Sequence, residues 1–198
     1  DYRTAAGKTW RDSQTADIVS ADLFTQAECQ RQAVHDVKAL ANLLSKGDAE
    51  VSVFWKDKAT GLRCRARPDW LHWHAPKAVT VLDIKTISEL TADSVQKAVA
   101  NYGYHRQAAH YVNGLRASGL HVEEFVFGFV SSSYPYLAAA YVLDDESMAQ
   151  GRDEVGELLS RFNECQKLGQ WPAFGDGYQA TGLPAWAKRT SEVEVGYV

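Results

Sequence analysis

Two aspartates and a lysine in this sequence have the types and spacing that metal-assisted hydrolysis of a phosphodiester requires. Asp83 and Lys85 are two positions apart, so on a strand their side chains leave by the same face. Asp69 lies 14 positions before Asp83, which leaves room for one strand, a turn and the next strand. Two aspartates that converge repel each other unless a cation lies between them, and a set of oxygen ligands favours Mg²⁺ or Mn²⁺.

Lys85 would supply the third part of this chemistry, because a lysine can orient or deprotonate the attacking water or stabilise charge in the transition state. Taken alone, Asp83 and Lys85 fit an ordinary salt bridge better than a catalytic pair. The residues around them change that balance, since the run from Ala78 to Ile84 is apolar apart from Thr80 and Asp83. Charges within an apolar strand indicate a functional site more than a solvated face.

The composition is that of an ordinary globular protein. The chain has 198 residues, 45% of them hydrophobic and 23% charged, which predicts a single domain over 1–198 with a substantial core. No apolar run approaches the roughly 20 residues of a membrane span, and the first ten residues lack the apolar centre of a signal peptide. Cys29, Cys64 and Cys165 favour neither a disulfide framework nor a zinc site, so a reducing, cytoplasmic setting is expected.

The net charge of −4 argues mildly against a nucleic-acid-binding protein, but local patches decide contacts with phosphate. Between residues 56 and 67 the chain has several basic side chains and one acidic side chain, Asp57. The basic residues are Lys56, Lys58, Arg63, Arg65 and Arg67. This segment is a candidate phosphate-binding region, with a solvated strand face as the alternative.

Hydrophobic periodicity predicts an α/β fold with a mixed central sheet flanked by helices. One helix is expected from Thr25, as its N-cap, to residue 46, and another from Thr91 or Asp93 to about 118. The remaining expected elements are strands at 50–55, 62–70, 78–86, 124–130 and 136–143, a hairpin turn at 57–61 and a helix at 145–168. A loop or arm is expected at 1–14, and an irregular tail at 169–198.

A set of short motifs occurs in order along almost the whole chain. They are Glu50; Gly61 with Cys64-Arg65; Arg67-Pro68-Asp69; Leu82-Asp83-Ile84-Lys85-Thr86; Tyr104-His105-x-Gln107-x3-Tyr111; Trp171-Pro172; and Leu183-Pro184-x-Trp186-Ala187-Lys188. In this order and spacing they resemble the PD-(D/E)xK nuclease superfamily, and within it the RecE-type exonucleases (exonuclease VIII and its phage relatives). The resemblance implies the restriction-endonuclease-like core of that superfamily.

The resemblance also implies a role for each residue of the expected metal site. Asp69 and Asp83 match the metal-binding acids, with the backbone carbonyl of Ile84 as a further ligand, and Lys85 matches the catalytic lysine. Together they would hold one or two Mg²⁺ ions, for which Mn²⁺ would substitute. Glu50 matches an upstream acid that binds metal directly or through water, although a glutamate at the start of a strand is as often merely solvated.

Gln107 and Tyr111 match a Gln-x3-Tyr motif that in relatives helps to hold the DNA strand and the lysine. Their i, i+4 spacing puts both on one helix face. The remaining candidates for DNA contact are Arg65, Arg67, Thr86, Tyr104 and His105. Arginines beside an acidic metal site are interpreted as phosphate contacts, whereas His105 either reaches a phosphate or packs locally.

The sequence departs from these relatives at one point. They carry a histidine in a Gly-x3-His context on an earlier helix, and it contributes to their metal site. His35 lies on the first expected helix, but its neighbours Ala33, Val34 and Asp36 do not match that context. We expect the histidine in an N-terminal segment that precedes Asp1.

The resemblance implies digestion of linear double-stranded DNA from its ends, in the 5′ to 3′ direction, which leaves 3′ single-stranded tails for recombination by strand annealing. It also implies a homo-oligomeric ring around the DNA, a single-strand annealing protein as partner, and the cytoplasm of a bacterium or a phage-infected cell as the location. Two alternatives stay open. One is an endonuclease or a single-strand or flap nuclease on the same fold, and the other is a DNA-binding module with impaired catalysis.

Overall fold

The computed structural model describes residues 3–16, 18–173, 175, 177–184 and 187. The chain divides into two units, Asp1–Asn163 and Glu164–Val198. The boundary falls within the last helix, α6 (Asp145–Leu168), whose bounds are those predicted from the sequence. Every strand that the structure describes lies in the first unit. In the second unit, the described residues after Leu168 form no α-helix or β-strand.

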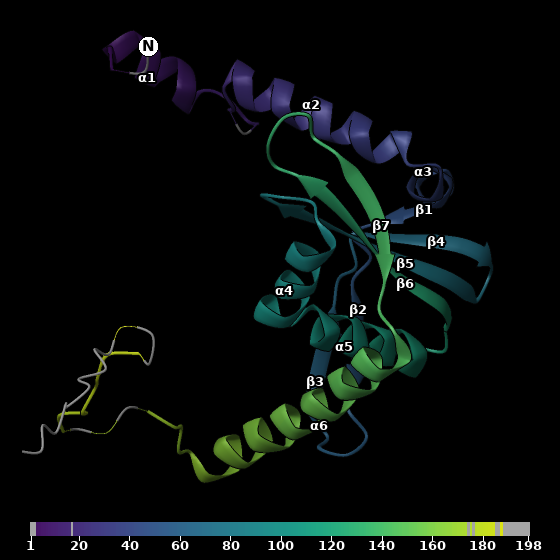
Figure 1. Ribbon diagram of the computed structural model, residues 1–198, viewed down its shortest axis with the longest axis vertical. Coiled ribbons are helices and arrows are strands. Elements are labelled where there is room, and N and C mark those ends of the chain that lie inside the picture. The colour runs from purple at the N-terminus through teal and green to yellow at the C-terminus, as the bar shows by residue number, and fades with distance from the viewer. Residues whose placement is uncertain (1–2, 17, 174, 176, 185–186, 188–198) are drawn as a thin grey trace, which may run out of the picture. The chain divides into compact units, whose positions relative to one another are not determined.

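A five-stranded mixed sheet forms the centre of the first unit, in the order β1-β4-β5-β6-β7 (Figure 1). Its strands are β1 (Gly47–Ala49), β4 (Trp70–Ala75), β5 (Ala78–Ile87), β6 (His121–Ser131) and β7 (Ala138–Val142). β5 and β6 are parallel, whereas the other neighbouring pairs are antiparallel. A parallel pair needs a crossover connection, which α4 (Ala92–Tyr102) and α5 (Tyr104–Ala117) provide. The predicted mixed sheet is confirmed.

A separate two-stranded sheet is formed by β2 (Val53–Lys56) and β3 (Arg63–Ala66). The predicted turn between them is confirmed, and the carboxylate of Asp57 closes it by accepting hydrogen bonds from the N–H and hydroxyl of Thr60, at 2.8 and 2.7 Å. The sequence prediction was wrong on the strand at 62–70, because β3 ends at Ala66. Pro68 is buried and has no N–H to donate to a ladder, so the segment 67–69 crosses from one sheet to the other.

The strand predicted at 50–55 is also interrupted. β1 ends at Ala49 and β2 begins at Val53, because the backbone of Glu50 lies in the left-handed region, with φ at 56°. A left-handed residue other than glycine cannot continue a β-ladder and costs roughly 1–2 kcal/mol. The β-strands expected at 78–86, 124–130 and 136–143 correspond to β5, β6 and β7.

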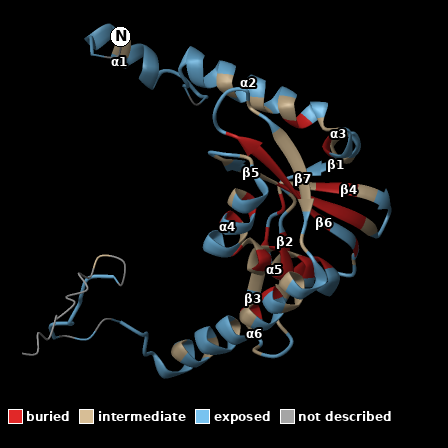
Figure 2. Ribbon diagram, in the orientation of Figure 1, coloured by how far each residue is buried: buried red, intermediate tan, exposed pale blue. Residues whose placement is uncertain are grey.

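Helices cover both faces of the central sheet (Figure 1). α2 (Ala21–Asp36) and α3 (Lys38–Leu44) pack on one face, where the buried residues are Val34, Leu40, Leu82, Val126 and Val130. α4 and α5 pack on the other face, against a larger cluster that includes Val79, Val81 and Phe127. Side chains of β5 therefore alternate between the two faces, as the period of a strand requires. Buried residues gather in the central strands and in α5, whereas α2 and α6 are mostly exposed (Figure 2).

The helices at the N-terminal end differ from the prediction in three ways. The arm expected at 1–14 contains a helix, α1 (Ala5–Asp12), which begins after Thr4. The N-cap of α2 is Ser20, whose hydroxyl accepts from the N–H of Leu23, and not Thr25, whose hydroxyl bonds within the helix. The helix also does not continue to residue 46, because the backbone of Val37 is extended and separates α2 from α3. α3 then buries Leu40 against the sheet.

The helix expected from Thr91 to about 118 is split at Gly103. Of the two predicted starts, Thr91 is the N-cap, and its hydroxyl accepts from the N–H of Ser94 at 3.1 Å. Gly103 adopts φ 66° and ψ 37° between α4 and α5. Glycine takes this left-handed conformation without the steric cost of a Cβ, so the chain turns there and α5 takes its own direction.

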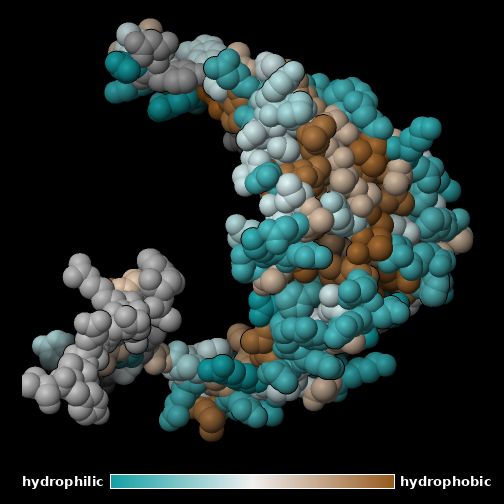
Figure 3. Space-filling view, viewed as in Figure 1, coloured by the Kyte–Doolittle hydropathy of each residue, from teal (hydrophilic) through white to brown (hydrophobic). Residues whose placement is uncertain are grey.

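The surface adds two observations. Apolar side chains gather over β7 and the strands beside it (Figure 3), and β7 is an edge strand. None of the described helices has the length and apolar character needed to cross a membrane.

Candidate active site

A cavity of about 510 Å³ contains most of the side chains that the sequence singled out. It lies where the central sheet, the β2–β3 hairpin and α5 meet. Its lining residues are Glu50, Ser52, Arg65, Ala66, Arg67, Asp69, Asp83, Lys85, Gln107 and Tyr111. Strands β3 and β5, helix α5 and the segments 50–52 and 67–69 therefore bring acidic, basic and amide side chains to one place.

Asp83 and Lys85 project from the face of β5 that carries α4 and α5. Asp83 is only 1% exposed, and its Oδ1 forms an ion pair with the ammonium of Lys85. The same ammonium lies 4.9 Å from the ring centre of Tyr104, within the range of a cation–π interaction. The lysine is thus held on two sides, and the predicted shared face of the Asp-x-Lys pair is confirmed by the ion pair.

Gln107 and Tyr111 reach the cavity from α5. The amide Nε2 of Gln107 donates a hydrogen bond to Oδ2 of Asp83, at 2.9 Å. One helical turn later, Tyr111 lines the same cavity, as the i, i+4 spacing predicts. Gln107 therefore holds one oxygen of the Asp83 carboxylate while Lys85 pairs with the other.

Asp69 stands at the start of β4, beside Asp83 on β5. The last pair of the β4–β5 ladder joins Trp70 to Leu82, and Oδ2 of Asp69 then accepts a hydrogen bond from the N–H of Ile84 at 2.8 Å. Because the N–H and C=O of one strand residue point to the same edge, the carbonyl of Ile84 faces the same side as Asp69. The structure thus places both aspartates and this carbonyl at one end of the ladder.

The electrostatics of the cavity disfavour the ionised form of both carboxylates at once when no cation is bound between them. Burial raises the pKa of Asp83, and the nearby charge of Asp69 raises it further. The ion pair with Lys85 and the hydrogen bond from Gln107 act in the opposite direction, but burial prevails. A divalent cation between the two carboxylates would reverse this balance, because it favours the ionised form of both.

The donor set fits a hard cation such as Mg²⁺. Oδ1 of Asp83 is buried, and its polar contact within the described part of the chain is the ammonium of Lys85, so a carboxylate oxygen with more than one lone pair keeps capacity for a cation. Within the described residues no group of three or more His, Cys, Asp or Glu side chains could hold a metal ion. A metal bound in this cavity would have Asp69, Asp83 and the carbonyl of Ile84 as its ligands, with water in the remaining positions, as Mg²⁺ prefers.

Glu50 and Arg67 form the rim of the cavity. Nε of Arg67 lies 2.8 Å from Oε2 of Glu50, and both side chains are largely exposed. The N–H of Glu50 donates to the carbonyl of Asp69 at 3.0 Å, so the left-handed backbone of Glu50 is anchored beside the acid. Strained residues of this kind gather at functional sites.

A family model described as "PDDEXK-like domain of unknown function (DUF3799)" matches residues 3–180. The chain belongs to this family. A comparison with curated proteins finds none that matches.

One solved structure agrees with the fold of this PDDEXK-like domain. A candidate exonuclease from Eubacterium rectale is 15% identical, with a TM-score of 0.61, over 84% of this chain and 64% of that one. The domain thus spans 64% of the length of that structure. Two other structures are more distant. An alkaline exonuclease from Laribacter hongkongensis is 16% identical, with a TM-score of 0.38, over 84% of this chain and 86% of that one. A phage-related exonuclease from Haemophilus somnus is 12% identical, with a TM-score of 0.42, over 84% of this chain and 85% of that one.

Three predicted DNA contacts of the PDDEXK-like domain, Thr86, Tyr104 and His105, are not among the residues that line the cavity. Thr86 is exposed and leaves β5 by the face opposite Lys85. His105 points to a different place: its Nε2 is 3.0 Å from Oε2 of Glu154 on α6, and its Nδ1 is 3.4 Å from the carbonyl oxygen of Val99. Gln107 faces the cavity and His105, two positions earlier on the helix, faces away, so the contacts that the structure shows for His105 are local ones.

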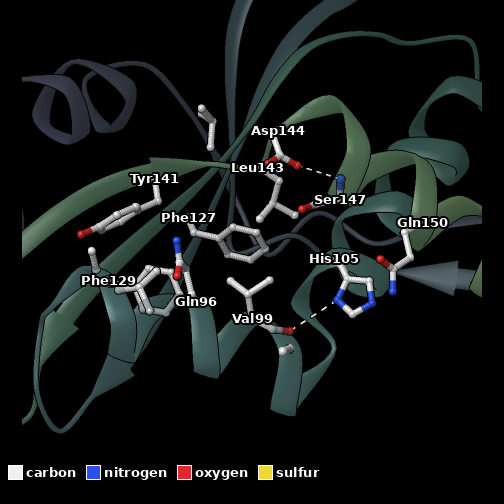
Figure 4. Close-up of a pocket in the computed structure, with 14 residues that line it drawn as sticks. Gln96, Val99, His105, Phe127, Phe129, Tyr141, Leu143, Asp144, Ser147 and Gln150 are labelled. Atoms are coloured by element: carbon white, nitrogen blue, oxygen red, sulfur yellow. Dashed lines mark hydrogen bonds between the residues drawn. The ribbon is translucent and has the colours of Figure 1, made fainter.

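His105 lines a second cavity, of about 430 Å³, between α4, β6, β7 and the start of α6 (Figure 4). Phe127, Phe129, Val99 and Leu143 contribute apolar walls. Asp144 at its edge is engaged by the N–H of Ser147, at 2.7 Å (Figure 4). The acidic and basic side chains that line this cavity are those of Asp144 and His105, whereas three carboxylates, a lysine and two arginines line the first one.

Sequence reasoning missed two lining residues, Ser52 and Ala66. Ser52 follows Glu50 by two positions, and that spacing was the available signal. Tyr104 lies against the ammonium of Lys85, and its contact with DNA stays a prediction. His35 is exposed on α2. Of the C-terminal motifs, Trp171 and Leu183 are exposed, whereas Trp186 and Lys188 lie outside the described residues.

Proposed function

We propose that this chain is a metal-dependent DNA nuclease of the RecE-type exonuclease kind, with its active site in the cavity of Asp69, Asp83 and Lys85. One observation carries the proposal. Two carboxylates, a lysine and an amide converge there, and the buried carboxylate of Asp83 contacts both the lysine and the amide. Fold likeness to a candidate exonuclease from Eubacterium rectale supports the same reaction class.

Each residue of the cavity has a distinct task in this proposal. Mg²⁺ bound there would polarise the scissile phosphate and make water a better nucleophile. Lys85, held by Asp83 and Tyr104, orients the attacking water and neutralises charge that develops on the phosphate. Gln107 keeps the carboxylate of Asp83 in one orientation, and Tyr111 beside it contacts the strand.

Arg65 and Arg67 bind phosphates at the rim of the cavity. Both are exposed there, and arginine matches phosphate oxygens with two parallel hydrogen bonds. Because Arg67 pairs with Glu50 at the surface, where an ion pair is worth little, an incoming phosphate can displace that pair at small cost. Glu50 is then released toward the cavity, where it supports the metal directly or through water.

The finer parts of the proposal follow the sequence motifs. We propose digestion of linear double-stranded DNA from its ends, 5′ to 3′, with release of 3′ single-stranded tails for strand annealing. A ring of identical subunits around the DNA and a single-strand annealing protein as partner belong to the same proposal.

The test is a digest of linear duplex DNA labelled separately at the 5′ and 3′ ends, with Mg²⁺, with Mn²⁺ and with chelator, beside covalently closed circular duplex. Early release of the 5′ label, intact circles and no cleavage with chelator are expected. Lys85→Ala should abolish cleavage. Lys97→Ala is the matched control, because Lys97 also pairs with an aspartate, Asp93 at 2.7 Å, but is exposed on α4 outside the cavity.

The outcomes separate the alternatives. Cut circles would indicate an endonuclease, and preferential cleavage of single strands or flaps a nuclease of that kind. DNA binding without cleavage in any metal would leave a catalytically impaired DNA-binding module. Full activity of Lys85→Ala would refute the assigned site.

A further inference from the structure

The β2–β3 hairpin has two faces of different character. Antiparallel register pairs Val53 with Ala66 and Trp55 with Cys64, and these side chains share one face. The alternate pairs, Phe54 with Arg65 and Lys56 with Arg63, share the other face. We refer to the four residues Phe54, Lys56, Arg63 and Arg65 as the outer face of the hairpin.

The inner face is fixed against α5. The ring of Trp55 lies 4.7 Å from the ring of His110, centre to centre. It also lies so close to Gly114 that a Cβ there would be 2.4 Å from the indole. Val53 and Ala66 are buried. This packing settles which side chains of the hairpin face outward, because a slip of one residue would expose Trp55 and bury charge.

The outer face combines an exposed aromatic ring with unneutralised positive charge. Phe54 is 70% exposed, and its cross-strand partner is Arg65. Lys56 stands directly opposite Arg63, a like-charge pair that destabilises a hairpin. No carboxylate of the described residues forms an ion pair with these three basic side chains, and the nearby Asp57 is engaged by Thr60.

The outer face is continuous with the active-site cavity. Arg65 belongs to both, since it lines the cavity with Asp69 and Asp83 and stands opposite Phe54. Arg63 lies two positions before Arg65 on β3, roughly 7 Å from it. A strand whose scissile phosphate lies at the cavity would therefore continue over Arg65, Phe54 and then Arg63.

We propose that the outer face of the hairpin binds an unpaired stretch of DNA next to the scissile phosphate, with Phe54 stacking on a base and Lys56, Arg63 and Arg65 contacting phosphates. The inference rests on the proposed nuclease function, and it names the form of DNA that the site receives. Aromatic stacking combined with a positively charged track is the general mode of single-strand binding. A base inside a duplex offers no free face, so Phe54 favours an end that has opened.

The test measures binding of the whole 198-residue chain to a fluorescent single-stranded oligonucleotide and to a blunt duplex, by anisotropy, in chelator so that no cleavage interferes. Phe54→Ala should weaken single-strand binding roughly 5- to 100-fold and duplex binding much less. Phe24→Ala is the matched control, because Phe24 is similarly exposed, on α2, and its binding should equal that of the wild type.

Two further variants separate stacking from folding and from charge. Phe54→Trp keeps an aromatic ring and should retain binding, whereas Phe54→Leu keeps apolar bulk and should lose it. The double variant Lys56→Ala/Arg63→Ala should lower the slope of log affinity against log salt by about 1.4, since each phosphate contact on a single strand contributes about 0.7. Lys77→Ala, exposed in the β4–β5 turn, should leave that slope unchanged.

The outcomes distinguish this inference from the proposed function. If Phe54→Ala binds single strands as the wild type does, or loses duplex affinity equally, the stacking role is wrong, even where the wild type cleaves DNA in Mg²⁺. If the wild type shows the expected binding pattern but cleaves nothing in Mg²⁺ or Mn²⁺, the strand-binding face stands and the nuclease proposal fails. Absence of any DNA binding would overturn both.

Discussion

The carboxylate of Asp69 accepts a hydrogen bond from the backbone N–H of Ile84, at 2.8 Å. β4 begins at Trp70, opposite Leu82, so β4 offers no strand partner to Ile84. Asp69 supplies that partner and closes the end of the ladder. The contact also sets the separation between Asp69 and Asp83, because Ile84 is the next residue along β5. One hydrogen bond thus couples sheet formation to the spacing of the two candidate metal ligands.

Substitutions at Asp69 should separate its structural role from its metal role. Asp69→Asn keeps an oxygen that can accept from Ile84, so the free energy of unfolding should stay within about 0.5 kcal/mol of the wild type. The loss of charge should nevertheless lower cleavage roughly 100-fold or more. Asp69→Ala should lose cleavage and also about 1–2 kcal/mol of stability, because the N–H of Ile84 loses its acceptor.

Urea unfolding in chelator and the end-labelled digest measure the two roles independently. Equal stability of Asp69→Asn and Asp69→Ala would contradict the structural role of the carboxylate. Cleavage by Asp69→Asn at the wild-type rate would contradict its role as a metal ligand.

Asp83 and Lys85 should be energetically coupled in the metal-free chain. Lys85→Met leaves the buried carboxylate of Asp83 without its counter-charge, so the variant should be destabilised by about 3 kcal/mol. The double variant Asp83→Asn/Lys85→Met removes both charges and should recover most of that loss. Urea unfolding of the wild type, both single variants and the double variant yields the coupling energy. Additive effects would show that the ion pair does not stabilise the fold.

Gly114 should control the position of the β2–β3 hairpin. Gly114→Ala places a Cβ at 2.4 Å from the indole of Trp55, and a packed indole cannot give way without moving the hairpin. The variant should lose about 1–3 kcal/mol of stability and should bind single-stranded DNA more weakly. Gly156→Ala is the matched control: it lies in α6 with open space around it, so it should keep or raise stability by up to about 1 kcal/mol. Thermal unfolding and anisotropy would reveal the difference, and parallel behaviour of the two variants would argue against this close packing.

His110 should make stability depend on pH near neutrality. Burial lowers the pKa of His110 from its ordinary value of 6.5, although a hydrogen bond with the backbone of Arg65 and the charge of Asp57 oppose this. The unfolded chain therefore takes up the proton first. As pH falls through 6.5 the fold loses stability, and the loss ends once the pH is below the pKa of the folded state.

Urea midpoints of the wild type and His110→Gln, measured between about pH 5 and pH 8, test this sign. The wild type should lose stability toward the acidic end, and His110→Gln should lose less. A steeper loss in the variant would mean that the protonated imidazole stabilises the fold.

The local sequence pattern was sufficient to predict many helices and strands, and to predict which side chains of the motifs share a face. The period-2 spacing of Asp83 and Lys85 and the i, i+4 spacing of Gln107 and Tyr111 predicted which side chains share a face, and the ion pair and the cavity agree. Such spacings depend only on backbone periods, so neighbours elsewhere in the chain do not alter them. The last helix, α6, has the bounds predicted from the sequence for the same reason.

Packing between elements far apart in the sequence decided the direction of some polar side chains and the ends of some helices, which the local pattern did not predict. His105 and Gln107 are two positions apart and equally polar, yet one faces Glu154 on α6 and the other faces Asp83 on β5. The breaks at Val37 and Gly103 were missed because a continuous apolar period masked them, while burial against the sheet required each helix to change direction.

The amino-acid sequence by itself determined the order of most elements, the mixed sheet and the residues that could do chemistry, because these follow from backbone periods and side-chain types. Only the tertiary structure decided that β3 and β4 belong to different sheets, and that the segment joining them, residues 67–69, carries Asp69 to Ile84. It also decided that Phe54 and Arg65 share an exposed face beside the cavity. Those relationships depend on which strands pair and on what covers each face, and both are properties of the whole fold.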